Sequence, residues 1–261
     1  MNQKIYQIDA FAETVFSGNP AAVCPLEKWL DDETMQKIAA ENNLAETAFY
    51  VYAGKMFEIR WFTPTVEVDL CGHATLAAAF VLFNQENYIG ERIEFYSPRS
   101  GSLTVTKNGD LLTLNFPADT IKDVPLIKEI EKCFDIQPVS AFKGKTDYLL
   151  VFENEEDIVN IKPAFDEISQ LACRGVIITA KGKNADFVSR FFAPQSGVKE
   201  DPVTGSAHTT LIPYWAAQLN KTEMNAIQLS ERKGHLTCKY LHDRVEIGGK
   251  GKLYLIGEIF I

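Results

Sequence analysis

The sequence predicts an α+β protein of two pseudo-symmetric domains, each a mainly antiparallel sheet curled around one central helix. The first observation is a duplicated phrase: Arg60-Trp61-Phe62-Thr63-Pro64 recurs as Arg190-Phe191-Phe192-Ala193-Pro194, 130 residues later in a chain of 261. The second is that each copy is followed by a glycine and an apolar run of helical length. The third is that the remaining apolar segments are mostly short and separated by turn residues, which indicates strands.

The first half contains two helices among short strands. We expect a helix from Asp31 to about Asn42, because acidic residues occupy its first turn and apolar residues recur at helical spacing. The segment from His73 to about Asn84 is apolar nearly all round, so this helix must be buried, and we expect the sheet to wrap around it. Strands are expected at 4–11, 21–24, 47–52, 57–62, 92–97, 101–107 and 111–116, with an Asn-Gly hairpin turn between the last two.

A polar stretch bounded by prolines, residues 117–125, predicts a linker and therefore domains 1-118 and 119-261. The order of elements then recurs, with a second central helix from Ser206 to about Leu219. Further helices are expected near 127–134 and 164–172, and strands near 148–152, 176–179, 187–192, 234–240, 244–248 and 254–260.

Composition excludes several classes of function. A formal charge of −9 without a basic cluster argues against a nucleic-acid or anionic-membrane partner. The start of the chain has no apolar signal core, and the longest apolar helical run is too short to span a bilayer. The five cysteines are odd in number, scattered and without a C-x-x-C pair, which is typical of a reducing compartment. We therefore expect a cytoplasmic protein with no membrane or nucleic-acid partner.

Two glycines, Gly72 and Gly205, stand just ahead of the predicted central helices. The first backbone N–H groups of a helix lack intrahelical partners and the helix dipole adds positive charge, so such an end binds anions. A glycine there lets a ligand approach the backbone. Two such ends facing one cleft predict a carboxylate-binding site. The alternative, that each glycine only permits a turn into an ordinary helix, is weakened by the duplication.

Three side chains near these ends are candidates for proton transfer. His73 lies in the first turn of its helix, where the positive helix end favours the neutral imidazole. Glu46 precedes an apolar strand, and desolvation there raises a carboxyl pKa toward a range useful for proton transfer. Asp201 precedes the second helix end. Glu46 and Asp201 could instead be solvated surface charges. His73 could make a structural hydrogen bond, and Ser206 could be a plain helix cap. His208 is a poorer candidate because it lies in the second turn of its helix.

Four segments, in this order, resemble the PhzF family, the phenazine biosynthesis-like isomerases, which are structurally akin to diaminopimelate epimerase. They are Phe16-Ser17-Gly18-Asn19-Pro20-Ala21-Ala22-Val23, Leu44-Ala45-Glu46-Thr47-Ala48-Phe49, Leu70-Cys71-Gly72-His73-Ala74-Thr75-Leu76-Ala77 and Glu200-Asp201-Pro202-Val203-Thr204-Gly205-Ser206-Ala207-His208.

The resemblance implies a diaminopimelate epimerase-like fold of two domains with the active site in the cleft between them, and a homodimer. It implies that Glu46 moves a proton between substrate carbons without a metal or organic cofactor. It further implies a pocket lined by Gly72, His73, Asp201, Gly205 and Ser206, with Asn19 close by.

The chain departs from the epimerase relatives at one position. Those enzymes use two facing cysteines, each just ahead of a glycine at a helix end. Here Cys71 occupies one such place and Thr204 the other. An alcohol cannot replace a thiol as a proton carrier near neutral pH, because its pKa is too high. A racemase that uses two thiols is therefore disfavoured.

The sequence thus predicts a cofactor-independent isomerase of a small carboxylate-bearing substrate, with Glu46 as acid/base and with His73 and Asp201 orienting the substrate or relaying a second proton. One alternative is an amino-acid racemase or epimerase that uses Cys71. Another is a catalytically silent small-molecule binding protein. Nucleotide cofactors are not indicated, since a G-x-G-x-x-G after a strand and a Walker loop are both missing from the sequence. The identity of the substrate is not readable from these residues.

Overall fold

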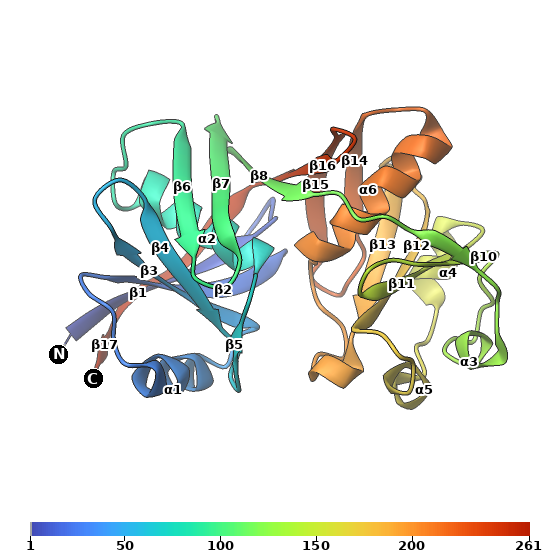
Figure 1. Cartoon of the computed structure of the whole chain (residues 1–261), viewed down its shortest axis with the longest axis horizontal. Helices are drawn as coiled ribbons and strands as arrows, with labels where there is room; N and C mark the ends of the chain where they lie inside the picture. The colour runs from blue at the N-terminus through green and yellow to red at the C-terminus, as the bar shows by residue number, and fades with distance from the viewer. Residues whose placement is uncertain (1) are drawn as a thin grey trace. The chain divides into compact units, whose positions relative to one another are not determined.

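The structure, a computed structural model, describes residues 2–261. Two compact units divide the chain: one extends to Asn115 and also includes Gly248–Ile261, and the other is Phe116–Ile247. The first unit contains strands β1 (Asn2–Ala10), β2 (Asn19–Leu26), β3 (Glu46–Tyr52), β4 (Phe57–Phe62), β5 (Glu67–Val68), β6 (Arg92–Ser97), β7 (Gly101–Asn108), β8 (Leu111–Pro117, which runs across the boundary) and β17 (Gly251–Phe260), with helices α1 (Asp32–Asn42) and α2 (Gly72–Asn84) (Figure 1).

The second unit repeats the strand-rich composition with a larger number of short helices. Its strands are β9 (Lys122–Val124), β10 (Ser140–Lys143), β11 (Asp147–Val151), β12 (Gly175–Lys181), β13 (Phe187–Phe192), β14 (Glu223–Gln228), β15 (Gly234–Tyr240) and β16 (Arg244–Gly249). Its helices are α3 (Lys128–Glu131), α4 (Glu155–Asn160), α5 (Phe165–Ser169), the 3₁₀ turn η1 (Pro194–Ser196) and α6 (Gly205–Leu219).

The strand order confirms the duplication. In the first unit β2–β3 is parallel, β3–β4 antiparallel, β4–β6 parallel and β6–β7 antiparallel. The second unit has the same series in β11–β12, β12–β13, β13–β14 and β14–β15. Each parallel pair needs a crossover connection, and helices occupy those crossovers. The predicted α+β class is therefore confirmed, with parallel pairs set among the antiparallel ones.

The last strand departs from the expected domain 119-261. β17 pairs antiparallel with β1 along its whole length, from Asn2 opposite Phe260 to Ala10 opposite Gly251, so residues 248–261 belong to the first unit. The alternating pattern of 254–260 identifies a strand but carries no information about which partner it pairs with. The other boundary, at Asn115, lies close to the expected linker.

Each central helix is buried as predicted. In α2, ten side chains are buried, and the helix packs against β1, β2 and β3. In α6, eight residues are buried, and the helix packs against β11 and β15. Helix α1 closes a further apolar cluster of the first unit around Met35, Phe49 and Phe62. In the second unit, α3, α4 and α5 contribute Ile130, Ile158 and Ile168 to a comparable cluster.

The arginines of the duplicated phrase have the same structural role in both units. Arg60 donates through Nε to Glu67 at 2.7 Å, and Arg190 donates through Nε to Glu200 at 2.7 Å. Each guanidinium also lies over the phenylalanine two residues later, at 5.1 Å for Phe62 and 5.0 Å for Phe192. The repeated Arg-aromatic-Phe sequence therefore fastens the strand to the loop that leads into each central helix.

The predicted linker is tied to the second unit at its start. Pro213, inside α6, has no N–H, so the carbonyl of Thr209 loses its intrahelical donor. The backbone N–H of Asp119 supplies that bond at 3.1 Å, and a carboxylate oxygen of Asp119 accepts from the Thr210 hydroxyl at 2.9 Å. Residues 122–124 then form β9, paired with β10. The segment 117–125 therefore contains a paired strand and hydrogen bonds to α6.

Several short elements differ from the expected ones. Helix α4 is missing from the sequence-based prediction, although Asn154 and Asp157 form a capping box at its start. Strand β14 is missing as well, and α3 and α5 are shorter than expected. These elements span few residues, so their periodicity is weak and tertiary packing decides them.

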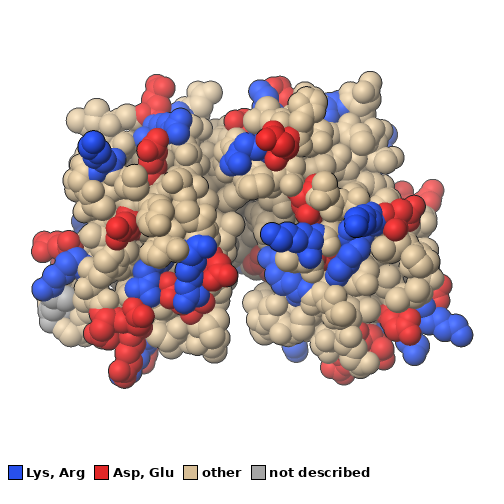
Figure 2. All heavy atoms as spheres, viewed as in Figure 1, with Lys and Arg blue, Asp and Glu red and all other residues tan. Residues whose placement is uncertain are grey.

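On the face of the molecule in Figure 2, lysine and arginine side chains lie among acidic ones, and the surface ion pairs include Lys37–Glu33 and Lys239–Glu223. None of the helices in residues 2–261 combines the length and apolar character needed to cross a bilayer. All five cysteines are free thiols, and four of them are buried.

Candidate active site

The site in the first unit is built where two parallel strands and a helix begin. β2 starts at Asn19 and β3 at Glu46, and the parallel register places Ala21 opposite Glu46, so both starting residues lie at one edge of the sheet. Helix α2 begins at Gly72, after an extended Cys71. The hydroxyl of Thr75 donates to the carbonyl of Cys71 at 2.6 Å, which holds the first turn.

These elements bring His73 against three polar neighbours. Its Nε2 lies 3.2 Å from Glu46 Oε2, and its Nδ1 lies 3.3 Å from the Asn19 side-chain nitrogen and 3.5 Å from Cys71 Sγ. Both ring nitrogens of His73 therefore have polar neighbours, the carboxylate on one side and Asn19 with Cys71 on the other. The imidazole is buried with 6% exposure, whereas the Glu46 side chain keeps 19%. Glu46 is therefore the member of this group that solvent reaches most easily.

The electrostatics of this group favour a shared proton. Burial by itself lowers the His73 pKa, but the adjacent Cys71 and Glu46 outweigh it and raise that pKa well above its usual value. The expectation that the helix end keeps His73 neutral is therefore wrong, because Cys71 and then Glu46 raise its pKa. Burial, and then Glu46, raise the pKa of Cys71 to about 11, so this thiol stays protonated near neutral pH. A Glu46–His73 pair can hold and move a proton, while Cys71 is a poor base.

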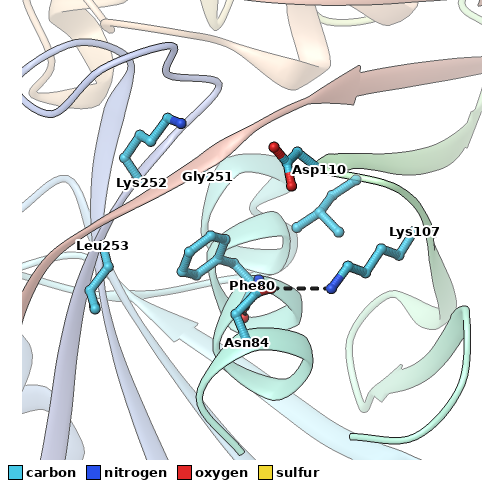
Figure 3. A pocket seen from close by; sticks show the side chains of 8 residues that line it. Phe80, Asn84, Lys107, Asp110, Gly251, Lys252 and Leu253 are labelled. Atoms are coloured by element: carbon cyan, nitrogen blue, oxygen red, sulfur yellow. Dashed lines mark hydrogen bonds between the residues drawn. The ribbon is translucent and has the colours of Figure 1, made fainter. Parts of the chain in front are cut away.

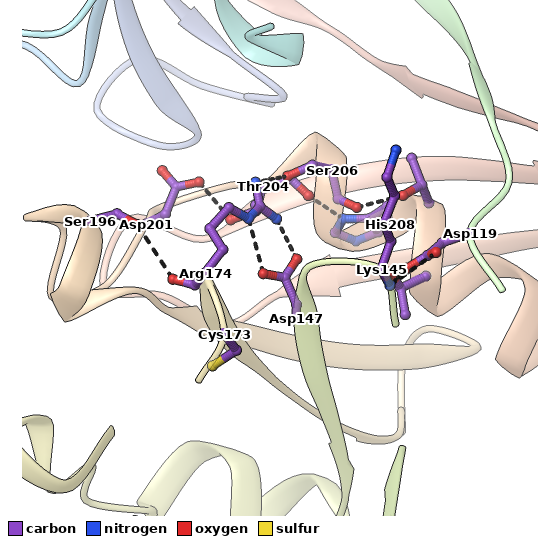
Figure 4. Close-up of polar contacts among 12 residues, drawn as sticks. Asp119, Lys145, Asp147, Cys173, Arg174, Ser196, Asp201, Thr204, Ser206 and His208 are labelled. Carbon is purple, nitrogen blue, oxygen red and sulfur yellow. Dashed lines mark hydrogen bonds and ion pairs between the residues drawn. The ribbon is translucent and has the colours of Figure 1, made fainter. Parts of the chain in front are cut away.

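In the second unit, Asp201, Gly205 and Ser206 gather at the start of α6 (Figure 4). The Thr204 hydroxyl donates to Asp201 Oδ2 at 2.6 Å. The buried Gln228 accepts from the Thr204 N–H at 2.9 Å and donates to the Asp201 carbonyl at 2.7 Å. Asp201 is thus positioned by the loop that precedes α6, and Thr204 occupies the place that Cys71 holds in the first unit.

Arg174 is a cation at this helix end that sequence reasoning missed. Its Nε donates to Asp147 Oδ1 at 2.9 Å, its Nη2 donates to the other carboxylate oxygen, and its Nη1 donates to Ser206 Oγ at 2.9 Å (Figure 4). Asp147 is buried with 2% exposure and the Arg174 side chain is 38% exposed. The segment around Arg174 has no periodicity, so no local signal marks it.

The internal repeat identifies the residue of the second unit that corresponds to Glu46, next to Arg174. β3 starts at Glu46, opposite Ala21, and β12 starts at Gly175, opposite Asp147. The second unit therefore has glycine at the position of Glu46. A Cβ on Gly175 would overlap the ring of Phe191, so an acid does not fit there. The two copies have diverged: one carries a carboxylate beside its helix end, and the other a guanidinium.

His208 has a structural role. It is fully buried, its Nδ1–H donates to the Thr204 carbonyl at 2.8 Å, and its ring lies 6.0 Å from that of Phe187. Burial, partly opposed by the bond to Thr204, lowers its pKa to about 4. The neutral ring therefore belongs to the core, as its place in the second turn of the helix predicts.

We expect His208 to make stability fall as the pH is lowered from about 6.5 to about 4. The unfolded chain binds a proton at this histidine below about pH 6.5 and the folded chain only near pH 4, so acid favours unfolding, by roughly 3 kcal/mol across that window. Urea unfolding of wild type and of His208→Asn, whose amide can keep the bond to Thr204, measures the difference. Equal pH slopes in the two proteins would contradict the prediction.

A surface pocket of about 280 Å³ lies elsewhere in the first unit (Figure 3). It is lined by Phe80, Asn84, Lys107, Asp110, Leu112, Gly251, Lys252 and Leu253. Lys107 donates to Asn84 at 3.1 Å and lies over the ring of Phe83, so it is engaged in local structure. None of the predicted site residues lines this pocket, and we assign it no catalytic role.

Comparisons with known proteins find relatives over nearly the whole chain. The sequence model of the PhzC-PhzF family, described as phenazine biosynthesis-like protein, matches residues 8–255. An uncharacterized isomerase of Pseudomonas aeruginosa is 52% identical over 260 residues, 99% of each chain. The crystal structure of a PhzF-family phenazine biosynthesis protein from Enterococcus faecalis superposes with a TM-score of 0.98 at 48% identity and covers 100% of both chains.

A more distant structure shows the fold alone. A hydroxyproline epimerase from Agrobacterium vitis superposes with a TM-score of 0.63 at 8% identity, over 99% of this chain and 92% of the other. The expected epimerase-like architecture is confirmed by this likeness.

Proposed function

Because the chain belongs to the phenazine biosynthesis-like (PhzF) family, we propose that it is a cofactor-independent isomerase that moves a proton within a small carboxylate-bearing molecule. Family and epimerase-like fold together support the isomerase class. The observation that carries the finer proposal is the 3.2 Å contact between Glu46 Oε2 and His73 Nε2 at the start of α2.

In the proposed reaction, Glu46 takes a proton from a substrate carbon made acidic by adjacent unsaturation. It returns the proton to another carbon on the same face, so substrate and product have the same composition. His73 keeps the orientation of the Glu46 side chain, since its Nε2 lies 3.2 Å from Glu46 Oε2 and its Nδ1 lies 3.3 Å from the Asn19 side-chain nitrogen. Asp201 orients the substrate or relays a second proton.

The substrate carboxylate needs positive features, and each unit offers one. In the first unit, the positive feature is the pair of backbone N–H groups at Gly72 and His73, which have no intrahelical partner. In the second unit, the positive feature is the start of α6 at Gly205 and Ser206, where the Arg174 guanidinium donates to Ser206. The mechanism therefore requires no metal ion and no organic cofactor for charge stabilisation.

A deuterium-exchange screen tests this proposal. Small unsaturated carboxylates and amino acids are incubated with the protein in D2O, and deuterium uptake is followed by mass spectrometry. Uptake with conversion to an isomer supports the proposal. A ligand that stabilises the fold without uptake or conversion would instead favour a silent binding protein.

Cys71→Ala separates the isomerase from a thiol-dependent racemase. Because the Cys71 thiol is buried and its pKa is raised to about 11, we expect turnover to change less than about tenfold. The measurement is the initial rate on any substrate found in the screen, with Cys24→Ala as a control for loss of a buried thiol far from the helix end. Abolished turnover in Cys71→Ala alone would establish the racemase alternative.

A homodimer remains a prediction from the family resemblance. Sedimentation velocity over a range of concentrations measures it: we expect a species of twice the 29.2 kDa chain mass. A monomer at all concentrations would contradict it.

A further inference from the structure

The group at the start of α2 also has the composition of a metal site. Within residues 2–261, Glu46, Cys71 and His73 offer a carboxylate oxygen, a thiol sulfur and an imidazole nitrogen, all within 4.8 Å of one another. Oxygen, sulfur and nitrogen together suit zinc, which is a borderline acid, better than magnesium or calcium, which prefer oxygen alone. Three protein ligands with a fourth position open is a common arrangement for zinc.

The nitrogen–oxygen separation matches a tetrahedral ion, and the sulfur lies somewhat farther away. Bond lengths of about 2.3 Å to sulfur and about 2.0–2.1 Å to nitrogen and oxygen place tetrahedral ligand atoms roughly 3.3–3.6 Å apart. His73 Nε2 lies 3.2 Å from Glu46 Oε2 and 4.0 Å from Cys71 Sγ. The sulfur lies within 4.8 Å of the carboxylate oxygen and has to approach both ligand atoms, a movement that a change of the Cys71 χ1 angle can supply.

The surroundings support a cation as well. The Glu46 side chain keeps 19% exposure, which provides an approach for an ion, while His73 and Cys71 are nearly enclosed. The Nδ1 of His73 faces Asn19, whose carboxamide can present its oxygen to an Nδ1–H once Nε2 binds the ion. Histidine ligands of zinc are regularly oriented by such an outer contact.

We propose that Glu46, Cys71 and His73 bind a zinc ion that occupies the proton-transfer site and inhibits the enzyme. Binding displaces the Cys71 thiol proton and the Nε2 proton of the protonated His73, so the two side chains become a thiolate ligand and a neutral imidazole ligand and two protons are released. Zinc also takes the Glu46 carboxylate and the His73 Nε2 out of proton transfer. The inference goes beyond the proposed function, because binding and inhibition are separate measurements.

Binding is measured with the metal alone, on the full chain freed of metal by a chelator. Isothermal titration with Zn²⁺ is expected to give one ion per chain, proton release to the buffer, and an apparent affinity that rises with pH. Co²⁺ is expected to give an intense thiolate-to-metal absorption band. Both signals should be lost in Cys71→Ser and retained in Cys173→Ser, a matched cysteine change in the second unit.

Three outcomes overturn the inference: no binding by wild type, equal binding by Cys71→Ser, or a Co²⁺ spectrum without the thiolate band. Asn19→Ala, which removes the outer contact but no ligand, is expected to weaken binding roughly 10–100-fold. Circular dichroism confirms that each variant is folded. If Zn²⁺ binds as expected while Glu46→Gln keeps its turnover, the metal site stands and the proposed mechanism fails.

Discussion

Replacing Glu46 with Gln is expected to lower substrate deuterium exchange and turnover by about 10²–10⁴-fold, the usual contribution of a positioned acid or base. The amide has the size of the carboxylate but cannot accept a proton from carbon. It can still contact His73 Nε2, which lies 3.2 Å from the carboxylate oxygen in the wild type, so the fold should be retained. The measurement is exchange in D2O under saturating substrate.

The matched control is Glu33→Gln, a surface carboxylate in α1 whose side chain is 78% exposed. It removes the same charge from the same unit and is expected to leave the rate unchanged. Glu46→Asp keeps a carboxylate at a shorter reach and should retain part of the activity. Full turnover by Glu46→Gln would remove this residue from the mechanism.

Replacing Arg174 with Met is expected to destabilise the protein by about 3 kcal/mol, toward the lower end of the range for breaking a buried ion pair. The change leaves the Asp147 carboxylate, at 2% exposure, without its bidentate partner. Because the Arg174 side chain is 38% exposed, water can reach the carboxylate after truncation and limit the loss. Urea unfolding measures the free energy.

Two comparisons isolate the ion pair in this experiment. Lys37→Met breaks a pair whose side chains are 71% and 78% exposed, and such surface pairs contribute at most about 1 kcal/mol. The double change Arg174→Met with Asp147→Asn removes the uncompensated charge and is expected to recover part of the stability. A loss in Arg174→Met no larger than in Lys37→Met would show that the pair contributes little.

The long helices and most strands could be predicted from the sequence. Helix α1 begins after Asp31, whose side chain accepts from the Thr34 N–H at 2.8 Å, as the acidic start indicates. Strand β6 has the predicted bounds, and the all-round apolar character of α2 correctly indicates burial. Each of these elements has a repeating pattern over several residues, which local side-chain periodicity reports directly.

The candidate site was only partly readable. The duplicated phrase and the glycines point to the two helix starts, and Asn19, Glu46 and His73 do lie together in the first unit. Arg174, by contrast, is recognised only from its bonds to Asp147 and Ser206. The protonation preference of His73 was predicted in the wrong direction because its pKa depends on the distances to Cys71 and Glu46, which a sequence does not contain.

By itself, the sequence determined that the chain is a duplication, that each copy has a buried central helix, and that an acid stands at the start of the strand β3. Only the tertiary structure decided that β17 pairs with β1, that Gly175 stands at the position of Glu46 in the second copy, and that Glu46, Cys71 and His73 form one cluster. The physical reason is the distance along the chain over which each interaction acts. Periodicity and capping act over one or two turns, whereas strand partners and ion pairs are chosen by packing between residues far apart in the chain.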